Sequence, residues 1–329
     1  MIISKTPFRI SLVGGGTDLK SFYKDYPGGV ISTCIDKYIY LSMHEYFHPS
    51  RYLLKYSKTE EVGSVDEINH NIIREVFRYF GISNVDFNST ADIPAGTGMG
   101  SSSAFTCGLV NLCCHYQDKN LPNYEIARLA CHFEIDILHE PIGKQDQYGC
   151  AVGGLKYIQF NPDETVEIKP ILMPYPKYLK LQNNLLLFST NSTRSAFSIL
   201  KEQNNNTIES FVIKENLKNL AHLASQLFND LNKGNIDAVG AYLDEAWQRK
   251  KMLASKISNA EIDNIYNIAL QNGATGGKLL GAGGGGFLLF YVPEENHEKI
   301  RKALKIFREL PFEFDFEGTK IIFRKYKTL

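Results

Sequence analysis

The chain has 329 residues, enough for about two domains and for large cores, which excludes a disulfide-stapled mini-protein and a lone peptide-binding module. Its 43% hydrophobic and 22% charged residues are typical of a globular protein and exclude a disordered or low-complexity chain. The 36 Lys and Arg residues balance 36 Asp and Glu residues, so the basic excess of a dedicated nucleic-acid binder is missing. A small polar substrate fits this balance better than nucleic acid does.

The chain shows no pattern typical of a membrane or secreted protein. Its apolar stretches are far shorter than the roughly 20 residues that cross a bilayer, and the opening sequence MIISKTPFRI has no apolar signal-peptide core. We therefore expect a cytoplasmic protein without membrane contact. Six cysteines, none in a CxxC pair, are expected to be buried thiols and not disulfides or zinc ligands. They are Cys34, Cys107, Cys113, Cys114, Cys131 and Cys150.

The first half mixes strand and helix patterns. Strands are expected, in chain order, at residues 8–13, 30–33, 38–47, 85–91, 155–160 and 165–168. Helices are expected at residues 69–79, 101–116 and 123–138. Residues 38–47 alternate with the period of two that a half-buried strand shows, and the series of neighbouring strands indicates an antiparallel sheet.

The proline-bearing stretch 169–177 is the best candidate for a domain boundary. We place the N-terminal domain at residues 1–172 and the C-terminal domain at residues 173–329. The second half is expected to contain, in order, a strand at 184–190, helices to about residue 271, a strand at 287–292, a helix at 294–307 and strands at 312–316 and 320–324. Helices that are segregated from a mostly antiparallel sheet make both halves α+β.

Two short strings match known motifs in the wrong context. His44 and His48 satisfy the HExxH pattern of zinc proteases, but in a strand residues four apart are separated by about 13 Å, too far to share a metal ion. The string GAGGGG at 281–286 satisfies GxGxxG, yet it leads into a strand, whereas the dinucleotide fingerprint opens a helix. Neither a zinc protease nor a Rossmann dehydrogenase is expected.

The clearest chemical signal lies between the strand at 85–91 and the helix at 101–116. Three alternating glycines let the backbone approach a ligand, and the free N–H groups and positive dipole end of the following helix attract phosphate. A merely capped helix would need one serine and one glycine, whereas this segment carries three of each. The predicted phosphate and nucleotide site comprises Pro94, Gly96, Thr97, Gly98, Met99, Gly100, Ser101, Ser102 and Ser103.

This loop resembles the PxGxGLGSS(A/S)A signature of the GHMP kinases, the family of galactokinase, homoserine kinase, mevalonate kinase and phosphomevalonate kinase. Two further segments are similar to family motifs in the expected order, namely TPFRISLVGGGTD at 6–18 and KLLGAGGGG at 278–286. The resemblance implies a two-domain α+β fold, with a ribosomal-protein-S5-domain-2-like N-terminal half and a ferredoxin-like C-terminal half. It also implies ATP and Mg²⁺ as cofactors.

The segment GKQDQY at 143–148 resembles the sugar-kinase segment whose aspartate faces the phosphoryl acceptor. A carboxylate there, Asp146, can accept or orient the hydroxyl proton during phosphoryl transfer. The alternative for Asp146 is an acid on a surface loop. Arg9 lies in a strand among apolar neighbours, so it needs an anion, either Asp146 or the transferring phosphate. The resemblance gives Arg9 a supporting catalytic role, and the alternative is a purely structural ion pair.

The resemblance also implies a magnesium site. Glu134 lies in the expected helix at 123–138, where the family carries a carboxylate that holds Mg²⁺ together with a serine of the glycine-rich loop. Ser102 and Glu134 supply the hard oxygen ligands that Mg²⁺ prefers. Asp136 is the substitute if the helix register differs, and a solvated helix charge is the alternative for Glu134.

The sugar side of the site is expected near Asp18. The resemblance places Asp18 on the sugar hydroxyls, although it could instead cap a helix at 19–26. Gly15 and Gly16 stand where galactokinases carry the Glu and His that contact galactose, which argues against galactose and leaves room for a larger sugar. The expected substrate-binding residues are Gly15, Gly16, Thr17, Asp18, Lys278, Gly283 and Gly284.

The three motifs together resemble the branch of the family that acts on D-glycero-D-manno-heptose 7-phosphate. This implies transfer of the ATP γ-phosphoryl group to the anomeric hydroxyl, giving heptose 1,7-bisphosphate. A sugar phosphate also needs a cationic clamp, for which Arg194, Lys251 and Lys278 are candidates, Lys278 foremost. The alternatives are a kinase of an unphosphorylated sugar such as fucose, mannose or galactose, and a sugar-sensing regulator without turnover. The sequence does not predict the oligomeric state.

Overall fold

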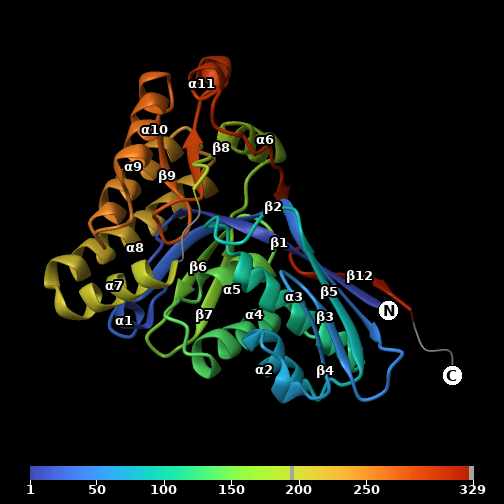
Figure 1. The fold of residues 1–329 in the computed structure, drawn as a ribbon. Helices are drawn as coiled ribbons and strands as arrows, with labels where there is room; N and C mark the ends of the chain where they lie inside the picture. Colours follow the sequence, from blue (N-terminus) through green and yellow to red (C-terminus); the bar gives the residue numbers. More distant parts are fainter. Residues whose placement is uncertain (193–195, 326–329) are drawn as a thin grey trace.

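The computed structural model describes residues 1–192 and 196–325, so the clamp candidate Arg194 lies outside the described residues. Two β-sheets and the helices packed against them make up this part of the chain (Figure 1). No helix in these two described ranges is both long and apolar enough to span a bilayer. The expected α+β class is confirmed.

Within the described residues, the larger sheet has nine strands in a mostly antiparallel arrangement. They are β1 (Ile2–Val13), β2 (Gly28–Glu45), β3 (Tyr52–Lys55), β4 (Thr59–Val62), β5 (Val85–Ala91), β6 (Lys156–Phe160), β7 (Val166–Pro170), β11 (Phe314–Asp315) and β12 (Lys320–Arg324). The order β12-β1-β2-β5-β3-β4 forms the main path, with β6 and β11 also on β2, and β7 on β6. The parallel pair β3 and β5 departs from the antiparallel expectation.

Strand β2 is continuous, whereas the sequence predicted two strands at 30–33 and 38–47. The residues between them stay extended because Cys34 and Ile35 pair both with β1 and with β11, which comes from the far end of the chain. His44 lies on this strand and not on a helix, which agrees with our interpretation of the HExxH string.

Helices α2 to α5 gather on one face of the larger sheet (Figure 1). The elements are η1 (Val65–Glu67), α2 (Asn71–Phe80), α3 (Ser101–Tyr116), α4 (Asn123–Cys131), the π-helix η2 (His132–Ile137) and α5 (Gln145–Ala151), with the short α1 (Lys20–Tyr23) following β1. Helix α3 is buried over most of its length between the sheet and its neighbours. The predicted helix at 123–138 thus ends in a π-helical turn, a distortion found often at functional sites.

The second half contains the smaller sheet, in the order β8-β10-β9. Its elements are α6 (Tyr175–Asn183), β8 (Leu185–Ser189), α7 (Ala196–Glu209), α8 (Phe211–Asn232), α9 (Val239–Lys251), α10 (Ala260–Gln271), β9 (Gly276–Leu279), β10 (Phe287–Tyr291), η3 (Glu294–Asn296) and α11 (His297–Ala303). Residues 308–310 continue the sheet beyond β8, through a bridge between Glu309 and Phe188. The resulting order is ferredoxin-like, as expected.

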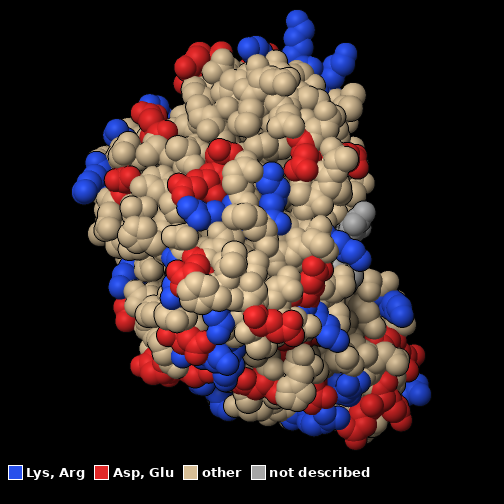
Figure 2. All heavy atoms as spheres, turned by 90° about the vertical axis from the view of Figure 1, so that its left-hand side faces the viewer, with Lys and Arg blue, Asp and Glu red and all other residues tan. Residues whose placement is uncertain are grey.

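The two halves share one hydrophobic core, which runs from Phe8 and Leu41 to Leu217 and Phe290. Strands β11 and β12, which follow the second half in sequence, return to the larger sheet and pair with β2 and β1. The division at residues 172 and 173 remains a prediction. On the face shown in Figure 2, acidic and basic side chains are interspersed, in keeping with a formal net charge of +0. All six cysteines are buried and free, as expected.

Candidate active site

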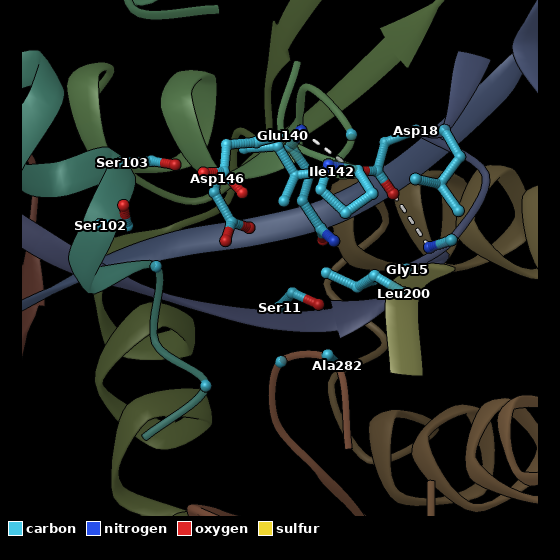
Figure 3. Close-up of a pocket in the computed structure, with 18 of the residues that line it drawn as sticks. Ser11, Gly15, Asp18, Ser102, Ser103, Glu140, Ile142, Asp146, Leu200 and Ala282 are labelled. Atoms are coloured by element: carbon cyan, nitrogen blue, oxygen red, sulfur yellow. Dashed lines mark hydrogen bonds between the residues drawn. The ribbon is translucent and has the colours of Figure 1, made fainter. Parts of the chain in front are cut away.

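A cavity of about 330 Å³ lies between the glycine-rich loop before α3, the C-terminal half of β1, the start of α5, helix α7 and the loop between β9 and β10. Figure 3 shows Ser102 and Ser103 at one end, Asp18 at the other and Asp146 between them. The predicted site residues on its wall are Arg9, Gly15, Gly16, Asp18, Gly96, Gly98, Gly100, Ser101, Ser102, Ser103, Glu134 and Asp146. Of the described residues, Pro94, Thr97, Met99, Thr17, Lys278, Gly283 and Gly284 were also predicted but do not line it.

The loop before α3 touches the second glycine-rich loop, at 281–286. Gly98 has a φ of +81°, and a Cβ there would lie 2.6 Å from the carbonyl oxygen of Leu280. Gly281 has a φ of +67°, and a Cβ there would lie 2.3 Å from the Cα of Gly98. Only glycine permits both the left-handed backbone and this approach. The loops from the two halves therefore close on each other at one end of the cavity.

The predicted loop residues that do not line the cavity support its shape. The hydroxyl of Thr97 donates a hydrogen bond to the carbonyl of Pro94 at 3.1 Å. The carbonyl of Met99 accepts from the backbone N–H of Arg9 at 3.1 Å. These contacts fix the loop against strand β1.

Arg9 and Asp146 form an ion pair at the centre of the cavity. The Nε and Nη2 groups of Arg9 donate to Oδ1 of Asp146 at 2.9 and 2.6 Å, and Nη1 donates to the carbonyl of Gly98 at 2.7 Å. The Arg9 side chain is 2% exposed, that of Asp146 30%. Burial alone would lower the pKa of Arg9, but Asp146, Cys150 and Asp18 together outweigh burial, Asp146 most of all, and the pKa is raised. Asp146 lies in the first turn of helix α5, so the surface-loop alternative is wrong.

Glu134 is buried under the serines that begin α3. Its carboxylate accepts hydrogen bonds from the hydroxyls of Ser102 (3.2 Å), Ser103 (2.8 Å) and Thr106 (2.9 Å) and from the amide of Gln147 (2.5 Å). Burial raises the pKa of Glu134, and the hydrogen bonds from Ser103, Gln147 and Thr106 partly offset that effect.

The chemistry of this donor set fits Mg²⁺. The hydroxyl of Ser102 and the carboxylate of Glu134 are hard oxygen ligands on one stretch of the cavity wall. Asp136 instead binds His132 at 3.0 Å, away from the cavity. The helix register therefore favours Glu134 over the substitute.

Asp18 forms the other end of the cavity. Its Oδ1 accepts from the N–H of Gly16 at 2.9 Å and its Oδ2 from the N–H of Gln145 at 3.2 Å. Burial, and after it repulsion from Asp146, raises the pKa of Asp18 to about 6. The alternative role as a helix cap is wrong, because α1 begins after Leu19 without a side-chain cap.

Thr17 supports the same turn from behind. Its hydroxyl donates to the carbonyl of Gly14 at 2.8 Å and accepts from the N–H of Gly29 at 3.0 Å. The side chain is fully buried and its polar atom is already used. Thr17 therefore shapes the loop that carries Asp18.

The cation on the cavity wall next to Arg9 is Lys250, which was not among the predicted site residues. Its Nζ donates to the carbonyls of Gly281 and Leu279, and burial, with repulsion from Arg9, lowers its pKa to about 8. The expected Lys278 lies behind the wall, with Nζ 3.3 Å from the Ser11 hydroxyl. Burial and repulsion from Lys250 lower the pKa of Lys278 well below its ordinary value.

The other described clamp candidate, Lys251, does not line the cavity, and its Nζ lies 3.8 Å from Oδ1 of Asp263. A signal for Lys250 was present in the sequence. Lys250 continues the buried stripe of Val239, Leu243 and Ala246 on α9, so a charged residue lies on an apolar helix face.

The room expected beside Gly16 is occupied. A Cβ on Gly16 would lie 2.3 Å from Nε2 of Gln203, whereas a Cβ on Gly15 would meet only Gln145 and Ser11 at 3.8 to 3.9 Å. The expectation that both glycines enlarge the sugar site is therefore wrong for Gly16. Gln145 and Gln203 both line the cavity and were not predicted as site residues.

Comparison with known proteins identifies the family. The model of the GHMP kinases N terminal domain matches residues 68–154, and that of the GHMP kinases C terminal matches residues 217–309, together more than half of the chain. A D-glycero-alpha-D-manno-heptose 7-phosphate kinase of Campylobacter jejuni is 28% identical over 97% of both chains. A galactokinase of Pyrococcus furiosus is 24% identical over 96% of both.

A solved structure shares the fold. The crystal structure of a D-glycero-D-manno-heptose 1-phosphate kinase from Bacteroides thetaiotaomicron superimposes with a TM-score of 0.82 at 24% identity, covering 99% of this chain and 100% of that one. The three motifs, the arrangement of the two sheets and the two matching domain models agree. The chain therefore belongs to the GHMP kinase family, and it is a phosphotransferase.

Proposed function

We propose that this enzyme is an ATP-dependent sugar kinase that phosphorylates the anomeric hydroxyl of D-glycero-D-manno-heptose 7-phosphate and gives heptose 1,7-bisphosphate. The observation that carries the proposal is the position of the Arg9–Asp146 pair, midway between the serine-rich start of α3 and the buried carboxylate of Asp18 (Figure 3). A nucleotide at one end and a sugar at the other would meet at Asp146.

The nucleotide phosphates would lie on the loop at 96–100 and on the first N–H groups of α3. The positive φ values of Gly96, Gly98 and Gly100 hold the loop in a conformation that exposes its backbone. Ser101 and Ser102 add hydroxyl groups at the helix start. Such a site binds phosphate through N–H groups and the helix dipole, without the need for a dedicated cation.

In the transfer step, Asp146 would accept the proton of the acceptor hydroxyl as its oxygen bonds to the γ-phosphorus. The bond between the γ-phosphorus and the β,γ-bridging oxygen breaks at the same time, and ADP leaves with that electron pair. Arg9 would hold the carboxylate in place through Oδ1 and offset the charge on the transferring group. Asp18 would accept hydrogen bonds from sugar hydroxyls and orient the acceptor.

Ser102 and Glu134 would hold Mg²⁺, which neutralises charge on the nucleotide phosphates when it is bound. Glu134 already collects three hydroxyl donors and one amide. These donors keep its carboxylate in one orientation. Ser102 lies at the exposed edge of this set, where it can turn toward a ligand.

The choice of a sugar that already carries a phosphate rests on Lys250 and on the heptose 7-phosphate kinase relative, which is similar over nearly the whole chain. Lys250 has only backbone carbonyls as hydrogen-bond partners among the described residues. A buried ammonium group without a carboxylate partner is costly, and a phosphate would compensate its charge. We assign the clamp to Lys250, with Lys278 behind it.

The test is ATP consumption with heptose 7-phosphate, heptose, mannose, fucose and galactose, followed by phosphorus NMR of the product. We expect a strong preference for heptose 7-phosphate and a new signal of an anomeric phosphate. Preference for a free sugar would show the alternative, a kinase of an unphosphorylated sugar. No ATP consumption above background with any of the five sugars would contradict the proposal and favour a sugar-sensing regulator.

A further inference from the structure

Two amide side chains on the cavity wall keep a polar atom without a partner. Among the described residues, no group hydrogen-bonds to Oε1 of Gln145 or to Nε2 of Gln203, although both atoms are buried. Five other buried side-chain atoms in the same part of the chain also lack a partner, but none of those residues lines the cavity. Because an unpaired buried amide is costly, these two atoms are candidates for contact with a ligand.

The two amides flank the same short turn at the sugar end of the cavity. A Cβ on Gly15 would lie 3.8 Å from the amide atoms of Gln145, and a Cβ on Gly16 would lie 2.3 Å from Nε2 of Gln203. Gln145 also donates its backbone N–H to Asp18, the residue assigned to the sugar hydroxyls. The unpaired groups therefore lie beside Asp18.

Gln203 reaches this place from the second half of the chain. It is 2% exposed and lies on α7, one turn after Leu200, which Figure 3 shows close to Gly15. Buried residues on α7 recur at Ile199, Gln203 and Thr207, so one face of the helix is turned inward. The Thr207 hydroxyl donates to the backbone carbonyl of Gln203, so Nε2 of Gln203 is the polar atom of these three residues that keeps no partner.

We propose that Gln203, together with Gln145 across the turn, selects the acceptor by hydrogen-bonding to its ring hydroxyls. An amide N–H donates to a hydroxyl oxygen and an amide carbonyl accepts from a hydroxyl, so the pair matches neighbouring hydroxyl groups of one sugar. A site that leaves such groups unpaired when a hydroxyl is missing discriminates strongly against the deoxy analogue. This inference rests on the proposed function, because it assumes that a sugar occupies this end.

The test combines Gln203→Met with sugars that lack single hydroxyls. The 2-, 3- and 4-deoxy analogues of heptose 7-phosphate would be compared with the parent sugar in steady-state kinetics. Gln203→Met should lower kcat/KM for the parent sugar by about 10- to 100-fold, mainly through KM, and leave the KM for ATP unchanged. For one of the analogues, the mutation should cause less than a threefold further loss, because the hydrogen bond is already missing.

Lys201→Met is the matched control, since Lys201 is exposed on the same helix and does not line the cavity. It should leave all sugars unchanged. Gln145→Met is the second variant. Its further loss of kcat/KM should become small for an analogue that lacks a different or neighbouring hydroxyl. If Gln203→Met is unstable, calorimetric titration of Gln145→Met with the parent sugar and the same analogues replaces it. The affinity lost by mutation is then compared between the parent sugar and each analogue.

Equal losses for the parent sugar and every deoxy analogue would overturn the proposal and give the glutamines a structural role. The proposed function fails in a different way, through lack of turnover of heptose 7-phosphate by the unmutated enzyme. In that case the same cycle uses the deoxy analogues of whichever sugar in the panel is phosphorylated. Absence of coupling there would overturn the assignment of the glutamines as well.

Discussion

Arg9 and Asp146, 137 residues apart in the sequence, meet through a single carboxylate oxygen. Both Nε and Nη2 of Arg9 donate to Oδ1 of Asp146, and none of the described residues donates to Oδ2. The remaining Nη1 holds the carbonyl of Gly98 in the loop before α3. One guanidinium thus ties the carboxylate to the nucleotide loop and leaves its second oxygen available to the acceptor.

Arg9→Lys should lower kcat by about 100-fold. Lysine keeps the positive charge but lacks the planar fork that holds Asp146 and Gly98 together. Removal of one preorganised donor in other enzymes costs about 10² to 10³ in rate. A kcat within threefold of the parent enzyme would show that charge alone is sufficient.

The raised pKa of Asp18, about 6 against an ordinary 3.8, predicts a pH-dependent stability difference. Between these two values the unfolded chain ionises while the folded chain keeps the proton, so rising pH makes the folded state relatively less stable. The full destabilisation of the folded state, about 3 kcal/mol, is present above pH 6 and absent below pH 4.

Asp18→Asn removes this ionisation. The unfolding free energy of the variant minus that of the parent should therefore rise by about 3 kcal/mol between pH 4 and pH 7 in urea titrations. Loss of the hydrogen bonds from Gly16 and Gln145 adds an offset that does not depend on pH. A flat difference across this range would contradict the buried, protonatable state of Asp18.

Lys250→Met should raise the KM for heptose 7-phosphate by about 100-fold and that for unphosphorylated heptose much less, because charge-assisted contacts to phosphate are lost. Lys251→Met, the matched control on the same helix, removes an ammonium that does not line the cavity and should change neither KM. The ratio between the two sugars is the decisive measurement. An equal effect on both sugars would mean that Lys250 only supports the loop at Gly281.

The pKa of Lys250, about 8, also predicts that affinity for the sugar phosphate depends on pH. Above pH 8 the side chain loses its proton, so affinity for the sugar phosphate should fall in the parent enzyme. Lys250→Met should lack this alkaline change. Measurement of KM from pH 7 to pH 9 in both proteins separates the clamp from other titrating groups.

Gly281→Ala should destabilise the protein more than Gly81→Ala. Both glycines have a positive φ, +67° and +60°, so both substitutions carry a similar backbone strain of about 1 kcal/mol. A Cβ on Gly81 meets no described atom within 4 Å, whereas one on Gly281 would lie 2.3 Å from Gly98. We expect Gly281→Ala to cost about 2 kcal/mol more in urea unfolding and to raise the KM for ATP. Equal costs would show that the two loops are not in close contact.

Local periodicity predicted the long regular elements well. The strand at 85–91 and the helix at 101–116 have the predicted bounds, because their patterns are sustained and end at clear breaks. Strands β3 and β4 have only four residues each, too few to show a period. The pairing of β12 with β1 joins the two ends of the chain, and no local pattern reports such a contact.

The parts of the site that carry motifs were predicted, and the parts that depend on tertiary packing were not. Asp146, the ion-pair partner of Arg9 in the structure, was one of the two anions predicted from the sequence for this buried arginine. Lys250 and Gln203 lie on helices without a motif, and only their place on inward faces marks them. Gly16 was misinterpreted because the side chain that fills its space comes from a distant helix. The roles of these residues remain predictions.

The most direct test of the proposed mechanism is single-turnover transfer from γ-labelled ATP to heptose 7-phosphate by Asp146→Asn, with ATP affinity measured by calorimetry on the same preparation. Asparagine keeps the shape and an oxygen for Arg9 but cannot take the acceptor proton. We expect a transfer rate lower by about 10³-fold and an ATP affinity within threefold of the parent enzyme. A variant that keeps more than a tenth of the parent rate would contradict the assignment of Asp146 as the residue that receives the proton.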